Sequence, residues 1–501
     1  MAVDVGTSAP LRMGTPRGRW VLLATVLGSG IAAIDATVVG IALPTIGREF
    51  SAPLSALQWV VTAYALTLAG LLLVGGALGD RYGRRRIFVI GVIGFAVASL
   101  LCAIAPTADF LVVSRALQGV GGALLTPGSL AILQASFAPD HRARAIGAWS
   151  GLGGVATAIG PFLGGWLIEV ASWRLIFSIN LPLALAVVLI AVRYVPETRD
   201  DTATGPVDAL GGALVTLGLM GVTYGLIEGP DSGWGSGPVA VALGVGVVLL
   251  AVFAWWEGRA PSPLLPAVAF ASRQFTAANV VTFVVYGALG GALFLIPIQL
   301  QQVAGYSPLE SGLALIPVTL IMLALSSRSG ALATRIGPRL QMSVGPVVVG
   351  LGLAMLTMVG PDASYVVHVL PAIVVFGLGL AITVAPLTAT VLAAAPANVA
   401  GMASAINNAV ARAAGLVAVA VLPAAAGIGG SVYLDPPAFS AGFHRAMLIC
   451  ALLCLLGGVL AALTIRNPSA EPIAVREGLV NCPLDAPPLR GESAGHRATT
   501  R

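Results

Sequence analysis

GALGDRYGRR at residues 76–85 recurs as GALATRIGPR at residues 330–339. Each copy lies between two long apolar runs and carries arginines, as expected of a short loop that joins two membrane-spanning helices. An internal repeat of this kind indicates two homologous halves, each with the loop after its second helix. The repeat therefore predicts a helical protein built twice on one plan.

The composition around the repeat is that of a membrane protein. The 501 residues are 57% hydrophobic and only 9% charged, and the mean hydropathy is +0.95, whereas soluble chains are about 25% charged. Many runs of about 20 residues lack a charge and could each cross about 30 Å of hydrocarbon. A disordered chain and a disulfide-linked secreted domain are excluded. The net charge of +5 is spread over loops, so nucleic acid is not an expected partner.

Apolar windows predict fourteen membrane-spanning helices. The expected spans are residues 20–43, 58–78, 87–105, 110–133, 144–168, 174–193, 208–228, 237–256, 276–300, 308–326, 340–358, 365–390, 400–424 and 443–465. The predicted fold is an all-α membrane protein with two six-helix bundles and two extra helices between them. The expected parts are an N-terminal segment, the first bundle, a linker with the extra helices, the second bundle and a disordered tail, at residues 1–19, 20–193, 194–275, 276–465 and 466–501.

Arginines predict the side of the membrane that each loop faces, because cytoplasmic loops are enriched in them. With the N-terminus inside, the cytoplasmic ends receive Arg12, Arg17, Arg19, Arg81, Arg84, Arg85, Arg86, Arg142, Arg144, Arg328, Arg335 and Arg339. The outer ends hold Arg48, Arg174 and Arg445. An even number of spans returns the C-terminus to the cytoplasm, and the expected location is the bacterial inner membrane, surrounded by lipid.

The residue types exclude several functions. All 26 basic residues are arginine, so the chain lacks the lysine of a phosphate-binding loop and is not expected to use ATP. The cysteines and histidines do not follow a metal-ligand spacing, and no nucleophile stands with a base, so metal ions, cofactors and catalytic residues are not expected. Short loops leave no room for a soluble sensor domain.

Asp35 lies within an otherwise uncharged span, where a carboxyl is costly enough to indicate a function. It lies about 12 Å from the outer end of its helix, and Arg115 lies about 9 Å from the outer end of the fourth span. We therefore expect them to interact, directly or through Gln118, Thr37 and water. Burial favours a neutral carboxyl and a nearby arginine favours an ionised one, so a moving arginine would load and release a proton. A static ion pair is the alternative.

The fifth span carries a second distinctive group, GVATAIGPFLGGW. Gly160, Gly164 and Gly165 let another helix approach closely, and Pro161 removes a backbone hydrogen bond and bends the helix. The group predicts a hinge or a seal. A kinked helix without functional motion is the alternative.

The repeated loop combines an acid with arginines in its first copy only, since Thr334 takes the place of Asp80 in the second. Arginines alone would anchor a cytoplasmic loop, whereas an acid beside a helix end can form a charge-assisted latch to another helix. We expect a conformational switch that is stronger in the first half. Its residues are Gly76, Asp80, Arg81, Gly83, Arg84, Arg85, Arg335 and Gly337.

Arg412 lies about 16 Å from the cytoplasmic end of its span, too deep to reach the surface comfortably. It is expected to face a central substrate cavity beside Asn407 and Asn408, with Thr37 as a further candidate. An arginine that only packs against backbone carbonyls is the alternative. Since Asp35 is the one carboxyl placed firmly in mid-span, hydrophobic monovalent cations, zwitterions and neutral molecules are the expected substrates. Arg412 leaves an anionic or amphoteric one open.

Four motifs together resemble the major facilitator superfamily, and within it the fourteen-span drug:proton antiporters of the EmrB/QacA type. IDATVVGIALP resembles the first-helix motif, GALGDRYGRRR the loop motif, LVVSRALQGVGG the proton-related motif of helix four and AIGPFLGG the antiporter motif of helix five. The resemblance covers residues 18–466. Gly40 stands where the family usually has Asn, and Ala156 where it usually has Gly.

The resemblance implies roles for the motif residues. Asp35 and Arg115, with Gln118 beside them, would couple protons, and Asp80 with Arg81 and Arg84 would control the conformational switch. The residues that would favour antiport over uptake are Gly160, Pro161, Gly164 and Gly165. The expected function is a proton-coupled multidrug exporter that moves small hydrophobic, cationic or neutral molecules by alternating access, as a monomer. A dedicated exporter of one metabolite or self-made antibiotic is the main alternative, and a membrane-embedded enzyme or sensor a remote one. A periplasmic partner is left unassigned.

Overall fold

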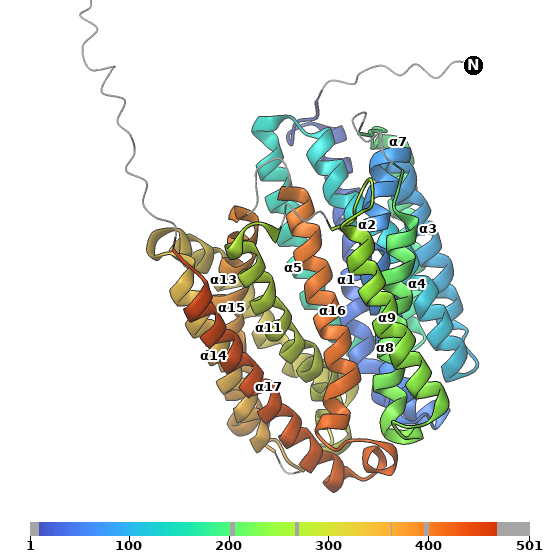
Figure 1. Ribbon diagram of the computed structural model, residues 1–501, viewed down its shortest axis with the longest axis vertical. Helices are drawn as coiled ribbons and strands as arrows, with labels where there is room; N and C mark the ends of the chain where they lie inside the picture. The colour runs from blue at the N-terminus through green and yellow to red at the C-terminus, as the bar shows by residue number, and fades with distance from the viewer. Residues whose placement is uncertain (1–9, 201–205, 266–269, 362, 395–399, 468–501) are drawn as a thin grey trace, which may run out of the picture. The chain divides into compact units, whose positions relative to one another are not determined.

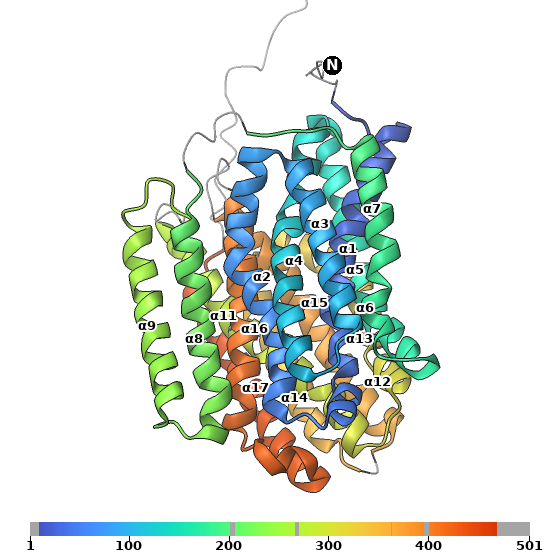
Figure 2. The ribbon, with the colours of Figure 1, turned by 90° about the vertical axis from the view of Figure 1, so that its right-hand side faces the viewer.

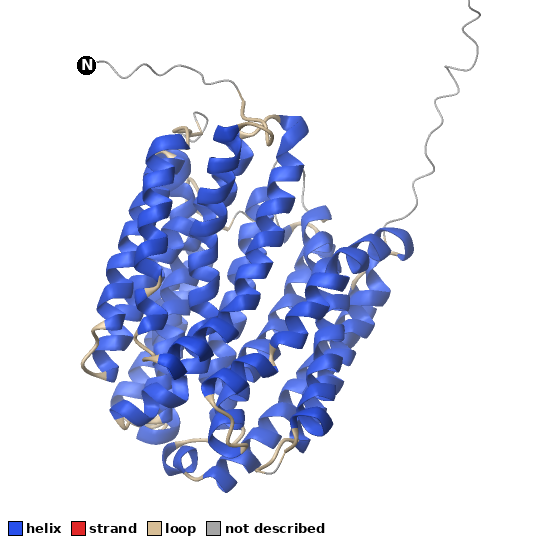
Figure 3. Ribbon diagram, turned by 180° about the vertical axis from the view of Figure 1, so that it is seen from behind, coloured by secondary structure: helices blue, strands red, loops and turns tan. Residues whose placement is uncertain are grey.

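The computed structural model describes residues 10–200, 206–265, 270–361, 363–394 and 400–467. The secondary structure of these residues is helical (Figure 3). One isolated β-bridge joins Leu11 and Phe137 within the described residues. Fourteen of the described helical segments are long and apolar enough to cross a membrane. The prediction of an all-α protein with fourteen spans is confirmed. The tail predicted to be disordered lies, beyond Asn467, outside the described residues.

The helices fall into three consecutive groups. The first comprises α1 (Pro16–Phe50), α2 (Leu54–Tyr82), α3 (Arg84–Ala103), α4 (Ala108–Ser136), α5 (Pro139–Val170), α6 (Leu175–Ser178) and α7 (Asn180–Tyr194). The extra pair comprises α8 (Ala209–Ser232) and α9 (Gly237–Glu257). The last comprises α11 (Arg273–Ile298), η1 (Gln299–Val303), α12 (Pro308–Ala314), α13 (Ile316–Ile336), α14 (Pro338–Met355), η2 (Leu356–Met358), η3 (Tyr365–Val369), α15 (Leu370–Ala393), α16 (Ala400–Ala425), η5 (Gly430–Leu434) and α17 (Pro436–Thr464).

The sequence repeat is also a structural repeat. In the first copy α2 ends at Tyr82 and α3 begins at Arg84, so the loop is reduced to Gly83. In the second copy Gly337 alone separates α13 from α14. Both glycines have a positive φ, 111° and 83°, a conformation that glycine adopts without a steric penalty. The repeated glycine therefore turns the chain abruptly from the second to the third helix of each half.

Helices of one half pack mainly on one another, and the extra pair contacts both halves. α4 packs on α2 and α3, and α1 packs on α5 and α7. In the second half α14 packs on α15 and α17, and α11 packs on α16 and α17. The extra helix α9 packs on α8, which in turn contacts α2 and α16. Figures 1 and 2 show this pair beside α2.

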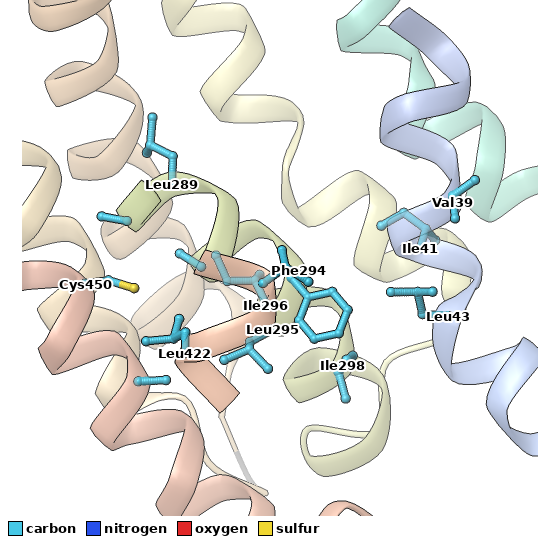
Figure 4. Packing of buried hydrophobic residues seen from close by; sticks show 14 of the residues in the cluster. Val39, Ile41, Leu43, Leu289, Phe294, Leu295, Ile296, Ile298, Leu422 and Cys450 are labelled. Atoms are coloured by element: carbon cyan, nitrogen blue, oxygen red, sulfur yellow. The ribbon is translucent and has the colours of Figure 1, made fainter. Parts of the chain in front are cut away.

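Buried apolar side chains connect the two halves near one end of the bundle. We call it the Glu49 end, because α1 ends there, and we call the opposite end, where α2 ends, the Asp80 end. One buried cluster runs from α1 into α11, α16 and α17. Figure 4 labels some of its members, Val39, Ile41, Leu43, Leu289, Phe294, Leu295, Ile296, Ile298, Leu422 and Cys450.

Polar contacts between the halves lie at the same end. Gln301 donates from Nε2 to the carbonyl oxygen of Ile41 at 2.9 Å. Gln58 donates to the carbonyl oxygen of Val419 at 2.7 Å, and Ser307 donates to a carboxylate oxygen of Glu169 at 3.2 Å. In the described residues, the side-chain hydrogen bonds that join the halves are therefore gathered at the Glu49 end.

Candidate functional site

The carboxylate of Asp35 is the centre of a buried polar network in the first half. Arg115 of α4 donates from Nη1 to Oδ2 at 2.5 Å. Oδ1 accepts from Gln118 Nε2 at 2.7 Å and from Asn180 Nδ2 of α7 at 3.3 Å. The hydroxyl of Ser99 in α3 accepts from the amides of Gln118 and Asn180 at 2.9 and 3.3 Å. Asp35 and Arg115 are each 1% exposed, so these side chains replace the water that a charged pair would otherwise need.

Arg115 is held on several sides. Its Nε donates to the carbonyl oxygen of Val60 at 3.1 Å, and its Nη1 also reaches Gln118 Oε1 at 2.6 Å. The guanidinium lies over the Tyr64 ring, 4.3 Å from its centroid, and 5.7 Å from that of Phe177. The cation therefore links α4 to α1, α2 and α6, and a change of charge on Asp35 would alter contacts on all of these helices.

Asp35 and Arg115 pair directly, which is one of the two arrangements expected from the sequence, and Gln118 forms a hydrogen bond with each of them. Thr37 is placed elsewhere, since its hydroxyl donates to the carbonyl oxygens of Ala33 and Ile34 in its own helix, at 3.2 and 2.9 Å. Sequence reasoning missed Ser99 and Asn180. Asn180 is a polar side chain in an apolar span and could have been flagged for that reason. Ser99 carries no comparable signal, because a small hydroxyl within a helix usually bonds to its own backbone.

The glycines of α5 lie where helices meet. A methyl group at position 160 would overlap Thr37 of α1, and one at position 164 would overlap Val38. A methyl group on Gly165 would overlap the Pro308 carbonyl of α12. In return, one on Gly312 of α12 would overlap the carbonyl of Pro161. Small residues therefore allow α5 to contact α1 on one side and the backbone of the second half on the other.

The Asp80 loop is tied to the chain that follows α7. Asp80 pairs with Arg84 across the single-residue loop, with Nη2 and Oδ1 2.7 Å apart. Glu197, which sequence reasoning missed, accepts from the backbone nitrogens of Arg85 and Arg86 at 3.0 and 3.2 Å. A carboxylate at this position complements the positive end of the α3 dipole. Asp80 and Glu197 thus both contact the first turn of α3, the next helix of the same half.

The other loop residues lie on the helices that flank the two glycines. Arg81, in the last turn of α2, has its guanidinium 5.7 Å from the Tyr82 ring centroid. Gly76 of α2 lies beside Pro127 of α4, and Arg335 lies in the last turn of α13. In the second copy the hydroxyl of Thr334 donates to Ala331 in its own helix at 2.7 Å. The replacement of Asp80 by threonine therefore turns a contact between helices into one within a helix.

The three residues expected to share a cavity in α16 divide between two environments. Asn407 donates to Asn279 Oδ1 and Thr282 Oγ1 of α11, at 3.1 and 2.9 Å. Arg412 donates from Nε to Asn408 Oδ1 at 2.8 Å, one turn away on the same helix. Asn407 therefore helps to pack the second half, and Arg412 and Asn408 form a separate pair.

The family model of the Major Facilitator Superfamily matches residues 25–420. The chain belongs to this superfamily. Among curated members, this facilitator is 36% identical to the tetracenomycin C resistance and export protein of Streptomyces glaucescens, over 81% of this chain and 76% of that protein. It is 34% identical to the multidrug efflux pump LfrA of Mycolicibacterium smegmatis, over 80% and 79% of the two chains.

Solved structures show the same fold at low identity. The crystal structure of the peptide transporter POT in complex with sulfate matches this facilitator with a TM-score of 0.66 at 16% identity, over 92% of this chain and 98% of that chain. A bacterial homologue of the human lysosomal transporter Spinster, in an inward-facing and unoccupied conformation, matches with a TM-score of 0.63 at 16% identity, over 90% and 97%. The protein is therefore a multi-pass transporter of small molecules in the cell membrane, and not an enzyme.

Proposed function

We propose that this facilitator is a proton-coupled multidrug exporter, which moves small hydrophobic organic molecules such as antibiotics and dyes out of the cell. The observation that carries the proposal is the buried carboxylate of Asp35, which accepts hydrogen bonds from α4 and α7. Two relatives, a tetracenomycin C resistance and export protein and a multidrug efflux pump, support a drug-like substrate. These relatives do not favour the alternative function, a dedicated exporter of one metabolite, over a multidrug pump.

Protonation of Asp35 would drive the conformational change. A proton on the carboxyl removes the negative charge that holds Arg115, so the hydrogen bonds between α1, α4 and α7 weaken together. The contact of α5 with α12 closes the Glu49 end, which the arginine pattern predicts to face outside. Release of this contact would open the path outward, in the alternating-access manner of two-half transporters.

The proton gradient supplies enough energy for export without a bound cofactor. A proton that crosses about 100 mV releases about 2.3 kcal/mol, and half a pH unit adds about 0.7 kcal/mol. One-for-one exchange would therefore support a substrate gradient of about a hundredfold. Because a single chain carries both halves of the fold, we further propose that it acts as a monomer.

Efflux of ethidium from pump-deficient bacteria that express the protein tests the proposal. We expect efflux to stop with an uncoupler and to fall by at least about tenfold in Asp35→Asn, because an amide cannot exchange a proton at neutral pH. Asp109→Asn, at an exposed carboxylate on α4, is the matched control and should keep efflux within about twofold of wild type.

Two results would contradict this proposal. Efflux that continues with the uncoupler would exclude the proton mechanism. Wild-type protein that is verified in the membrane of energised cells but moves neither ethidium nor any of a panel of dyes and antibiotics would exclude multidrug export.

A further inference from the structure

Arg412 is a half-buried cation within a membrane-spanning helix, and the described chain supplies no anion for it. It lies near the middle of α16 (Ala400–Ala425), about 18 Å from either end of the helix. None of the ion pairs among the described residues includes it. Its hydrogen bond to Asn408 uses Nε, whereas a guanidinium has five N–H donors. The two terminal nitrogens therefore remain available to an acceptor from outside the chain.

The charges at this depth do not balance. Asp35 and Arg115 neutralise each other, and Arg412 adds one positive charge. The other acidic residues of the described membrane helices lie within the first or last five residues of their helices, namely Glu49, Asp80, Asp109, Asp140, Glu169, Glu228, Asp231, Glu257 and Glu310. An uncompensated charge inside a membrane is costly and marks a substrate or ion pathway. A negative charge that arrives with a ligand would compensate it.

The Arg412 face of α16 is accessible rather than packed. Asn408 is exposed and Arg412 is half-buried, although both lie in the membrane-spanning part of the helix. The neighbouring Asn407 points to α11 instead. Asn408 and Arg412 are four residues apart and share one face, so this face of α16 carries polar groups in a position that a ligand can reach.

Tyr64 of α2 connects this face to the Asp35 network. α2 packs on α16, and Tyr64 lies close enough to both Arg412 and Asp35 to interact with their charges. Its ring also lies under the guanidinium of Arg115. Its hydroxyl is buried and has no hydrogen-bond partner among the described residues. A ligand at Arg412 would therefore bind beside the proton-coupling residues.

We propose that Arg412 binds an acidic group of the exported molecule, so that hydrophobic organic acids and zwitterions are among the substrates of this transporter. This inference rests on the proposed export function and names part of its substrate class. A carboxylate or sulfonate can accept two parallel hydrogen bonds from the guanidinium, while the apolar body of the molecule lies against the surrounding apolar side chains. The charge of Arg412 repels a ligand that carries only a positive charge.

The carboxylated dye rhodamine 110 and its methyl ester, rhodamine 123, form a matched pair of probes, because they share a fluorophore and differ in the acidic group. Fluorescence anisotropy would measure their equilibrium binding to the purified full-length protein in lipid nanodiscs. We expect Arg412→Gln to weaken binding of rhodamine 110 by about tenfold or more. Binding of the cationic rhodamine 123 should stay the same or become tighter, because the variant removes a repelling positive charge. Arg412→Lys should keep part of the acid binding, because it keeps the charge without the planar fork.

Arg328→Gln is the matched control, since Arg328 is an exposed arginine of α13 in the same half and the variant should bind both dyes as wild type does. Arg412→Gln that binds rhodamine 110 as tightly as wild type overturns the inference. Wild type that binds neither dye also overturns it. If Arg412→Gln does not fold, Arg412→Met takes its place, and size-exclusion chromatography shows whether that variant is folded. A folded Arg412→Met that still prefers rhodamine 110 to rhodamine 123 as strongly as wild type does also overturns the inference.

Transport of the same dyes separates this inference from the proposed function. If efflux stops with the uncoupler but acid binding does not depend on Arg412, the acid-binding site is contradicted and proton-coupled export is supported. If acid binding depends on Arg412 but efflux continues in the presence of the uncoupler, the acid-binding site is supported and proton-coupled export is contradicted.

Discussion

Two arginines lie deep in the membrane-spanning helices and differ in what surrounds them. Arg115 contacts the carboxylate of Asp35, the amide of Gln118 and a backbone carbonyl, and it is 1% exposed. Arg412 is half-buried and reaches the side chain of Asn408. A cation whose partners belong to the protein stabilises the packing around it, whereas a cation without an anion costs stability and is available to a ligand. The first arginine is therefore suited to a switch and the second to recognition.

The same contrast extends to the two halves. The halves share the glycine turn at Gly83 and Gly337, yet the buried ion pair of the described residues occurs in the first half. In the second half the buried side chains of Asn279 and Thr282 bond to the half-buried Asn407, and all three are neutral. The two halves thus share a backbone arrangement but differ in the polar side chains inside their helix bundles.

The largest expected difference is in the stability of variants that lack one or the other arginine. We expect Arg115→Met to lower the free energy of unfolding by about 3–5 kcal/mol, because Asp35 would remain buried without a counter-charge. Arg412→Met should be neutral or stabilising, because it removes an uncompensated charge. Unfolding of the purified protein in SDS, followed by circular dichroism, would measure both. Leu117→Met, at an exposed position of α4, is the control, and equal losses in the two arginine variants would contradict the contrast.

A smaller effect should distinguish two asparagines, the buried Asn180 and the half-buried Asn407. Asn180→Ala removes a donor that lies 3.3 Å from Asp35, so we expect dye efflux to fall by about fivefold, in line with the net contribution of about 1 kcal/mol of a typical hydrogen bond. Asn407→Ala removes contacts between neutral groups of the second half and should change efflux by less than about twofold. Efflux rates normalised to the amount of protein in the membrane would test this, and similar rates in both variants would argue against a special role for the Asp35 network.

The smallest effect is expected at the two loops. Glu197→Ala removes a carboxylate from the N-terminus of α3 and should lower stability by about 1 kcal/mol. Thr334→Ala removes a bond within one helix and should change stability by less than about 0.5 kcal/mol. Thermal unfolding of both variants would compare them, and a larger loss in Thr334→Ala would show that the second loop is the more tightly held.

Much of the fold could be predicted, because its signals are local. Each apolar run is long enough to cross a bilayer, so the fourteen spans followed from hydropathy and agree with the structure. The depth of Asp35 and Arg115 followed from the helical rise, and their direct pairing was one of the expected arrangements. The contribution of Asn180 was not predicted, because residues on α1, α4 and α7 meet only after three helices have packed.

The sequence by itself determined the number of spans, the repeat of the two halves and the superfamily, because apolar length and motif spacing survive any rotation of a helix about its axis. Tertiary structure decided which side chains meet. Successive residues of a helix point about 100° apart, so Asn407 and Asn408 could not face the same partner, and packing turned one to α11 and the other to Arg412. Packing likewise brought Glu197 to the start of α3, because a loop acid finds its partner only when the helices around it are in place.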